Sequence, residues 1–125
     1  MLANMPVALL LILASGILST QPVQAATEKD FDAFWAKFQM AVDKNDKRAI
    51  VSMTKCPFLF RSKQLTPQQL VGQIDKVFPP KVRSCIIKQK PILQNGSHFV
   101  MCGDFIYTFS KVNGRYMFTD VDAND

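Results

Sequence analysis

Apolar side chains recur with helical spacing between Thr27 and Val42. They fall at positions i, i+3, i+4, i+7, i+10 and i+11, which gather on one side of an α-helix. Thr27, with Asp30 three residues later, resembles a capping box in which Asp replaces the usual Glu. The spacing predicts a helix over 27–42 with a wide aromatic face that a broad apolar surface must cover. The residues of this face are Phe31, Phe34, Trp35, Phe38, Ala41 and Val42.

The sequence pattern in the middle of the chain predicts a short helix, a short strand and a connector. Asp46 is a good N-cap for a helix over 47–53. The apolar run at 56–60 favours a short strand, and Pro57, which has no N–H, places this strand at a sheet edge or gives it an irregular start. Residues 61–64 are polar and predict a connector.

Two further helices are predicted before residue 90. Thr66 followed by Pro67 and then Gln69 is a strong helix start, because Thr caps, Pro suits the first position and Gln completes a capping box. That helix is expected to run to residue 78. Pro79-Pro80 then opens a helix over 81–88, on which Val82, Cys85 and Ile86 share a side.

The period of apolar residues changes to two after Ile92. Asn95-Gly96 and Asn113-Gly114 are dipeptides of type I′ hairpin turns. Counting outward from the second turn, we expect to find Phe109 opposite Phe118, Tyr107 opposite Asp120 and Ile106 opposite Val121. Gly103 is expected to make a bulge or bend within a strand. The predicted fold class is α+β, with N-terminal helices packed on a curved antiparallel sheet.

The N-terminal segment has the features of a signal peptide. Residues 1–27 carry no charged side chain, Val7–Leu13 is an apolar run, and Val23-Gln24-Ala25 suits cleavage near Ala25-Ala26. The alternative is an uncleaved membrane anchor, but Gly16 and the polar residues after it keep the apolar run below the length of a span. We therefore expect a signal peptide over 1–25, a single domain over 26–125, a periplasmic or secreted location and no stable membrane span after cleavage.

Positive charge is concentrated in the middle of the chain. The formal net charge is +5, and the segment from Lys44 to Lys90 holds eleven basic residues against Asp46 and Asp75. Such a segment suits an acidic protein or an anionic envelope surface, although a solvated basic surface gives the same pattern. Nucleic acid is not expected as a partner, because no basic–aromatic motif is present and the expected periplasmic or secreted location does not suit such a partner.

Three cysteines remain after the predicted cleavage: Cys56, Cys85 and Cys102. An oxidising compartment favours one disulfide and one remaining thiol. All three pairings are open, and we favour Cys85–Cys102, which leaves Cys56 buried. With no CxxC motif and a single histidine, neither a metal site nor a cofactor is expected.

The order of motifs resembles the nuclear transport factor 2-like superfamily. The resemblance rests on the FxxFWxxF helix, the strand entered at Cys56-Pro57-Phe58, the mid-chain helices and the terminal Asn-Gly hairpin, and it spans about residues 28–121. It is closest to small exported bacterial members. It implies a cone in which helices close over a strongly bent sheet around a cavity. The superfamily hosts isomerases, dehydratases, ligand carriers and binding modules, so the fold alone does not give a function.

Enzymes of that fold use an Asp, Tyr or His lining the cone as a general base or hydrogen-bond donor. Asp104 and Tyr107 are the candidates here, with Asp104 either pointing inward as a base or capping a bulge. A cross-strand hydrogen bond to Asp120 also explains Tyr107. His98, which follows the Asn95-Gly96 turn, is expected at the surface.

The leading hypothesis is an exported, non-enzymatic binding domain that contacts a protein or an anionic envelope component. Its candidate binding residues are Lys81, Arg83 and Lys88 on the second face of the 81–88 helix, and it is a possible homodimer. One alternative is a small-ligand carrier or isomerase-type enzyme that uses the cone pocket. Another is a periplasmic inhibitor or immunity protein.

Overall fold

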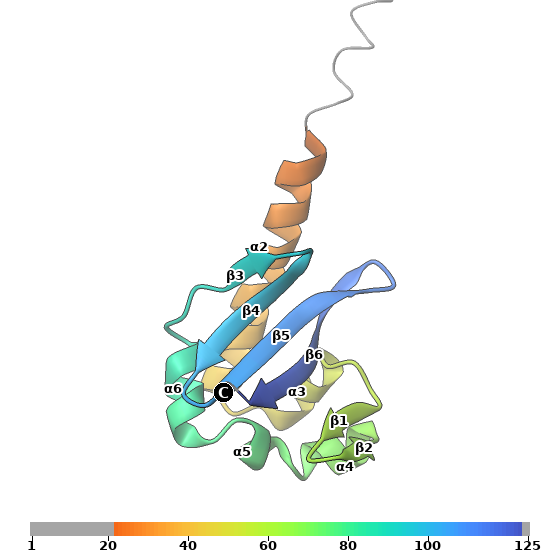
Figure 1. Ribbon diagram of the computed structural model, residues 1–125, viewed down its shortest axis with the longest axis vertical. Helices are drawn as coiled ribbons and strands as arrows, with labels where there is room; N and C mark the ends of the chain where they lie inside the picture. The colour runs from red at the N-terminus through yellow and green to blue at the C-terminus, as the bar shows by residue number, and fades with distance from the viewer. Residues whose placement is uncertain (1–21, 124–125) are drawn as a thin grey trace, which may run out of the picture. The chain divides into compact units, whose positions relative to one another are not determined.

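The computed structural model describes residues 22–123, with side-chain surroundings from Lys29 onward. Most of the predicted signal peptide therefore lies outside the described residues. The helices are α2 (Pro22–Asp43), α3 (Lys47–Ser52), α4 (Pro67–Val71), α5 (Ile74–Val77) and α6 (Pro80–Ile86). The strands are β1 (Phe58–Phe60), β2 (Lys63–Leu65), β3 (Ile92–Gln94), β4 (Ser97–Cys102), β5 (Phe105–Val112) and β6 (Arg115–Ala123) (Figure 1).

The chain divides into two compact units, and the boundary between them falls within α2. The first unit ends at Asp32 and the second begins at Ala33. The described part of the first unit is the beginning of α2, which starts at Pro22 and not at Thr27 as predicted. Ala25 and Ala26 explain the longer helix, because Ala has the highest helix propensity.

The second unit mixes helices with antiparallel sheets, which confirms the predicted α+β class. Four strands form one sheet in the order β3-β4-β5-β6, and β1 pairs with β2 in a separate two-stranded sheet. Both predicted Asn-Gly turns are confirmed, since Asn95-Gly96 joins β3 to β4 and Asn113-Gly114 joins β5 to β6, with all four residues at positive φ. Among the described residues, no helix is long and apolar enough to cross a membrane.

The part of the aromatic face of α2 that belongs to the second unit packs on the four-stranded sheet, as its spacing predicts. The ring of Phe109 in β5 lies 5.2 Å from that of Trp35 and 5.0 Å from that of Phe38. Rings from the segment after α5 and from the sheet continue this cluster. Phe38, Phe78, Tyr107, Phe109 and Phe118 are all fully buried.

The register of the last hairpin is only partly the predicted one. Phe109 lies opposite Phe118 as expected, but Tyr107 lies opposite Val121, and Thr108 opposite Asp120. A one-residue shift between Thr108 and Phe109 causes the difference. Without this shift, the two-residue period would turn Asp120 toward the core beside Phe118; with it, Asp120 is exposed.

Other predictions fail for local reasons. Gly103 is not a bulge within a strand; it lies at φ +64° in the tight turn from β4 to β5, where Cys102 pairs with Phe105. The segment predicted as a connector contains β2, which begins at Lys63. The helix predicted over 67–78 breaks into α4 and α5 around Gly72, a residue that weakens helix interiors.

Candidate functional site

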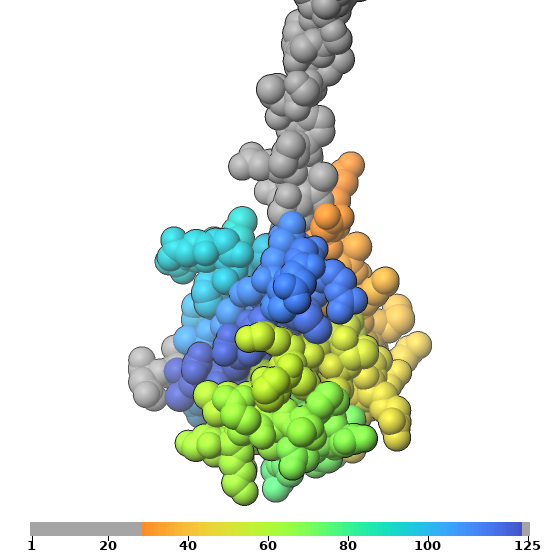
Figure 2. Space-filling view, turned by 90° about the vertical axis from the view of Figure 1, so that its right-hand side faces the viewer, coloured from red at the N-terminus to blue at the C-terminus, as the bar shows by residue number. Residues whose placement is uncertain are grey.

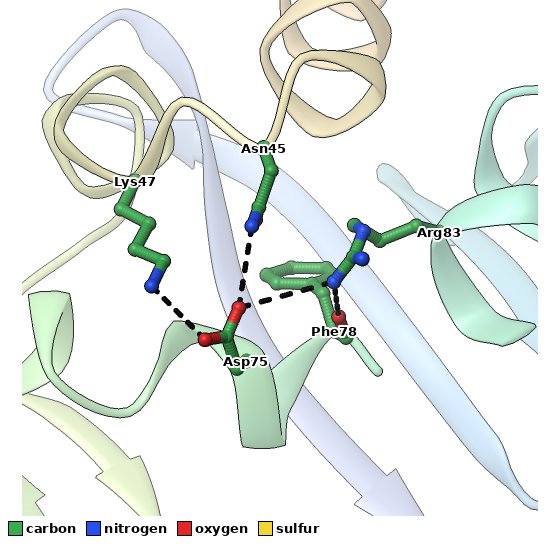
Figure 3. A network of polar contacts seen from close by, with 5 residues as sticks. All are labelled: Asn45, Lys47, Asp75, Phe78 and Arg83. Atoms are coloured by element: carbon green, nitrogen blue, oxygen red, sulfur yellow. Dashed lines mark hydrogen bonds and ion pairs between the residues drawn. The ribbon is translucent and has the colours of Figure 1, made fainter. Parts of the chain in front are cut away.

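Asp75 neutralises part of the basic middle segment (Figure 3). Its carboxylate accepts a hydrogen bond of 2.9 Å from Lys47 Nζ and one of 3.3 Å from Asn45 Nδ2, and it lies 3.9 Å from Arg83 Nη1. The hydrogen bond from Lys47, followed by that from Asn45, lowers the pKa of Asp75 from its ordinary value. Three helices, α3, α5 and α6, therefore meet at one carboxylate.

The three predicted binding residues do not form one exposed cationic face of a helix, because α6 ends at Ile86 and Lys88 lies just beyond it, not within it as predicted. Arg83 is only partly exposed, and its Nη1 also donates to the carbonyl oxygen of Phe78 at 2.9 Å. This contact satisfies a carbonyl just past the end of α5 and joins that end to α6. Lys81 and Lys88 are exposed. Arg83 therefore has structural contacts, while the two lysines are open to a partner.

A second group of basic residues surrounds a hollow of about 500 Å³ beside the β1–β2 hairpin. Its cationic side chains are Arg61 at the hairpin tip, Lys63 in β2 and Lys76 in α5. In Figure 2 the hairpin and the helices after it, drawn in yellow-green and green, face the viewer. The remaining lining residues are Phe60, Leu65, Gln69 and Gln73. We call these seven residues the basic hollow.

The basic hollow contains no carboxylate to balance its charge. All three of its cationic residues are exposed. Within the part of the chain that the structure describes, ion pairs form only at Asp75, which does not line the hollow. Three cations around one concave surface favour an anionic ligand.

The hairpin holds Arg61 in a defined orientation. Arg61 and Ser62 form the two-residue turn between Phe60 and Lys63, which pair across the hairpin. The guanidinium carbon of Arg61 lies 5.0 Å from the centre of the Phe60 ring. A cation held over an aromatic ring loses part of its rotational freedom, and the edge of its guanidinium plane remains able to donate.

The start of α4 orients an amide beside these cations. The predicted capping box is confirmed, with Thr66 Oγ1 accepting from the Gln69 backbone N–H and Gln69 Oε1 accepting from the Thr66 N–H. Because the side-chain oxygen of Gln69 is held at the cap, its NH₂ group points away from the cap as a donor. The hollow therefore combines three cations with an oriented neutral donor.

Asp104 and Tyr107, the predicted catalytic candidates, have different surroundings. Tyr107 is fully buried, and its hydroxyl donates to the carbonyl oxygen of Val77 at 2.6 Å, not to Asp120 as expected. Burial raises the pKa of Tyr107. Asp104 is exposed in the turn after β4 and lines a second, largely apolar hollow with Lys81 and Phe105. Tyr107 is not among the residues of that hollow.

Two other expectations about single residues are wrong. His98 is buried in β4, with its ring 5.6 Å from that of Tyr116, and is not a surface residue. Cys56 is half-buried and not fully buried, and this partial burial raises the pKa of its thiol. The predicted disulfide between Cys85 and Cys102 is present and joins α6 to β4.

Sequence reasoning identified the basic middle segment but not the basic hollow within it. The polar sequence around Arg61 and Lys63 predicts only a connector, and no sequence pattern links these two residues to Lys76. The available signal was the capping box at Thr66, which fixes a helix start next to these cations.

Among the described residues, no group of three or more His, Cys, Asp or Glu side chains is placed to hold a metal ion. Comparison of the chain with protein-family models, curated proteins and solved structures found no match.

Proposed function

We propose that this protein is an exported, non-enzymatic binding domain that recognises an acidic protein partner. The observation that carries the proposal is the basic hollow, in which Arg61, Lys63 and Lys76 surround a concavity without a carboxylate. In this proposal the α+β domain has the nuclear transport factor 2-like cone, and the cone is filled by aromatic rings. Binding then takes place on the outer surface and not in an internal pocket.

The surroundings of the two catalytic candidates support a binding role. A general base must reach the proton that it removes. The Tyr107 hydroxyl already donates its hydrogen bond to the Val77 carbonyl oxygen. Asp104 is an exposed turn residue, and it lines a hollow to which Tyr107 does not contribute. This arrangement favours a structural role for Tyr107.

Export is proposed on two observations. The disulfide between Cys85 and Cys102 suits an oxidising compartment. The uncharged apolar segment at the N-terminus has the pattern of a cleavable signal peptide. The partner is therefore sought among envelope or secreted proteins.

The test is direct binding of a fluorescent oligoglutamate peptide to the protein, measured by fluorescence polarisation at low and high salt. We expect Lys63→Glu/Lys76→Glu to abolish binding while the fold, followed by circular dichroism, is kept. The matched control is Lys37→Glu/Lys44→Glu, which changes the net charge equally at two exposed lysines, one in α2 and one directly after its end. We expect the control to retain binding, with at most a small loss from the weaker overall field.

A third variant, Lys81→Glu/Lys88→Glu, tests the two exposed lysines in and just after α6. Retained binding in this variant places the partner at the basic hollow. Equal losses in all three variants would show that the peptide responds to net charge alone and would contradict the proposal of a specific site.

A further inference from the structure

We infer that Arg61 is the specificity-determining anchor of the basic hollow, and that the hollow takes a peptide segment with closely spaced carboxylates. The inference rests on the proposed function and adds to it the contact residue and the ligand chemistry. Three observations carry it: the backbone at Arg61, the side-chain donors of the hollow and the size of the hollow.

The backbone at Arg61 adopts a conformation that its residue type does not favour. Arg61 and Ser62 lie at φ +51° and +68°, the signs of a type I′ turn. Among the described residues, two other two-residue turns have such signs, and both use Asn-Gly, at 95–96 and 113–114. Asn and Gly accept positive φ at little cost, whereas left-handed backbone disfavours most other side chains.

The exceptional turn is the one that borders the basic hollow. A residue kept in an unfavourable conformation indicates that its side chain is needed there. The side chain of Arg61 does not support the fold through an ion pair; it lies over the Phe60 ring at the surface. The hairpin therefore has a less favourable turn sequence than Asn-Gly, and this sequence presents a guanidinium at the edge of the hollow.

The donors of the hollow match carboxylates. A guanidinium binds a planar carboxylate through two parallel hydrogen bonds, which is the strongest geometry available to an arginine. Lys63 follows the turn directly, and Lys76 adds a second ammonium group from α5. The NH₂ group of Gln69, oriented by the cap, is suited to a peptide carbonyl or to another carboxylate oxygen.

The shape and lining favour a peptide over other anions. A hollow of about 500 Å³ is the size of a small-molecule site and is much larger than one phosphate ion. Phe60 and Leu65 supply apolar surface for the stems of acidic side chains. Lysine and arginine side chains donate hydrogen bonds and cannot accept them, so Arg61, Lys63 and Lys76 favour a ligand rich in acceptor oxygens over a saccharide, whose hydroxyl groups are also donors.

The test replaces the exceptional turn with the turn that this chain uses elsewhere. In the double variant Arg61→Asn/Ser62→Gly, we expect the thermal midpoint to rise, because the turn gains residues that favour it. We expect the affinity for oligoglutamate to fall about tenfold or more, since the bidentate contact is lost. A residue with only a structural role would not give opposite changes in stability and affinity.

Two single variants complete the test. Ser62→Gly keeps Arg61 and is expected to raise the thermal midpoint while the affinity stays within about twofold. Arg61→Lys keeps the charge but not the planar fork, and is expected to weaken binding several-fold. Competition with inorganic phosphate and with a uronic-acid oligosaccharide identifies the ligand class; we expect oligoglutamate to be displaced by neither at equal concentration.

Each contrary result has a distinct meaning. Unchanged affinity in Arg61→Asn/Ser62→Gly, together with lost affinity in Lys63→Glu/Lys76→Glu, would overturn the anchor role of Arg61 and leave the proposed function standing. Displacement by phosphate or by the oligosaccharide would overturn the peptide as ligand. Absence of oligoglutamate binding by the unmodified protein would overturn both the inference and the proposed function.

Discussion

Tyr107 is the residue at which the structural and catalytic interpretations differ most. Its side chain is fully buried, and its hydroxyl donates to the Val77 carbonyl oxygen, which lies in the last residue of α5. Because burial raises the pKa of Tyr107, the hydroxyl stays protonated and remains a donor at neutral pH. The bond joins the sheet to a helix end whose carbonyl groups lack partners within the helix.

Tyr107→Phe removes this one donor while keeping the ring that packs 5.2 Å from Phe78. We expect the free energy of unfolding to fall by about 1–3 kcal/mol, since the Val77 carbonyl is left buried without its hydrogen bond. Urea unfolding measures the change. Oligoglutamate binding should be unaffected, and a loss of binding with unchanged stability would contradict a structural role.

At the same scale, two separate causes explain why the sequence misplaces Tyr107, Asp120 and His98. The positions of Tyr107 and Asp120 were obtained by counting outward from a correctly predicted turn, and the count failed where β6 gains one residue. A hint was present: strict alternation would have turned the charged side chain of Asp120 toward the core. His98 was assigned to the surface from its closeness to a turn, although alternation along β4 places it on the buried side with Val100 and Cys102.

At the scale of elements, Asp75 joins three short helices that have few turns of their own. Lys47 belongs to α3, Asp75 to α5 and Arg83 to α6. Isolated helices of this length are not stable in water, so their positions depend on contacts between them. The ion pairs of the Asp75 carboxylate hold these short helices together, whereas longer helices obtain more stability from their own hydrogen bonds.

The Asp75 network makes stability depend on pH in the acid range. The pKa of Asp75 in the folded protein is lowered from 3.8. The ionised Asp75 carboxylate therefore contributes to the free energy of unfolding above pH 3.8, and this contribution is lost as pH falls through the folded pKa. We expect the thermal midpoint of the protein to fall more steeply below pH 3.8 than that of Asp75→Asn. Parallel acid profiles of the two proteins would contradict this role of the ion pair.

Elements with a local chemical signature were predictable, and the others were not. The Asn-Gly turns and the capping box at Thr66 act within four residues, so sequence alone identifies them. The hairpin at Arg61-Ser62 has no such signature, because its residues are uncommon at positive φ. For the same reason the sequence of β2 predicts a connector and not a strand. The missed element is the one that borders the basic hollow.

At the scale of the whole molecule, the distribution of charge depends on the fold. The sequence shows one basic segment, but folding places its cations in different surroundings. Two pair with Asp75, two lysines are exposed in and just after α6, and three line the basic hollow. Lys76 lies in sequence next to Asp75 but faces the hollow, whereas Lys47 and Arg83 approach Asp75 from other elements. Which cations are neutralised depends on tertiary contacts that no local pattern contains.

The disulfide is the covalent link of the second unit, since it joins α6 to β4 across 17 residues of sequence. It closes the segment that also contains the exposed edge strand β3. A loop of this length restricts the unfolded chain, and its closure stabilises the folded protein by about 3 kcal/mol in the chain-entropy treatment. The core of a domain this small has little surplus stability, so such a link is a large part of the total.

We therefore expect Cys85→Ser/Cys102→Ser to lower the free energy of unfolding by about 3 kcal/mol, measured by urea unfolding. Addition of a thiol reductant should lower the stability of the unmodified protein in the same way and leave the double variant unchanged. Cys56→Ser is the matched control: it removes the half-buried free thiol without opening a loop, and it should remain sensitive to the reductant. Because the basic hollow lies outside the closed loop, we expect the folded double variant to bind oligoglutamate normally. Loss of that binding in a protein that remains folded would show that the link also positions the hollow.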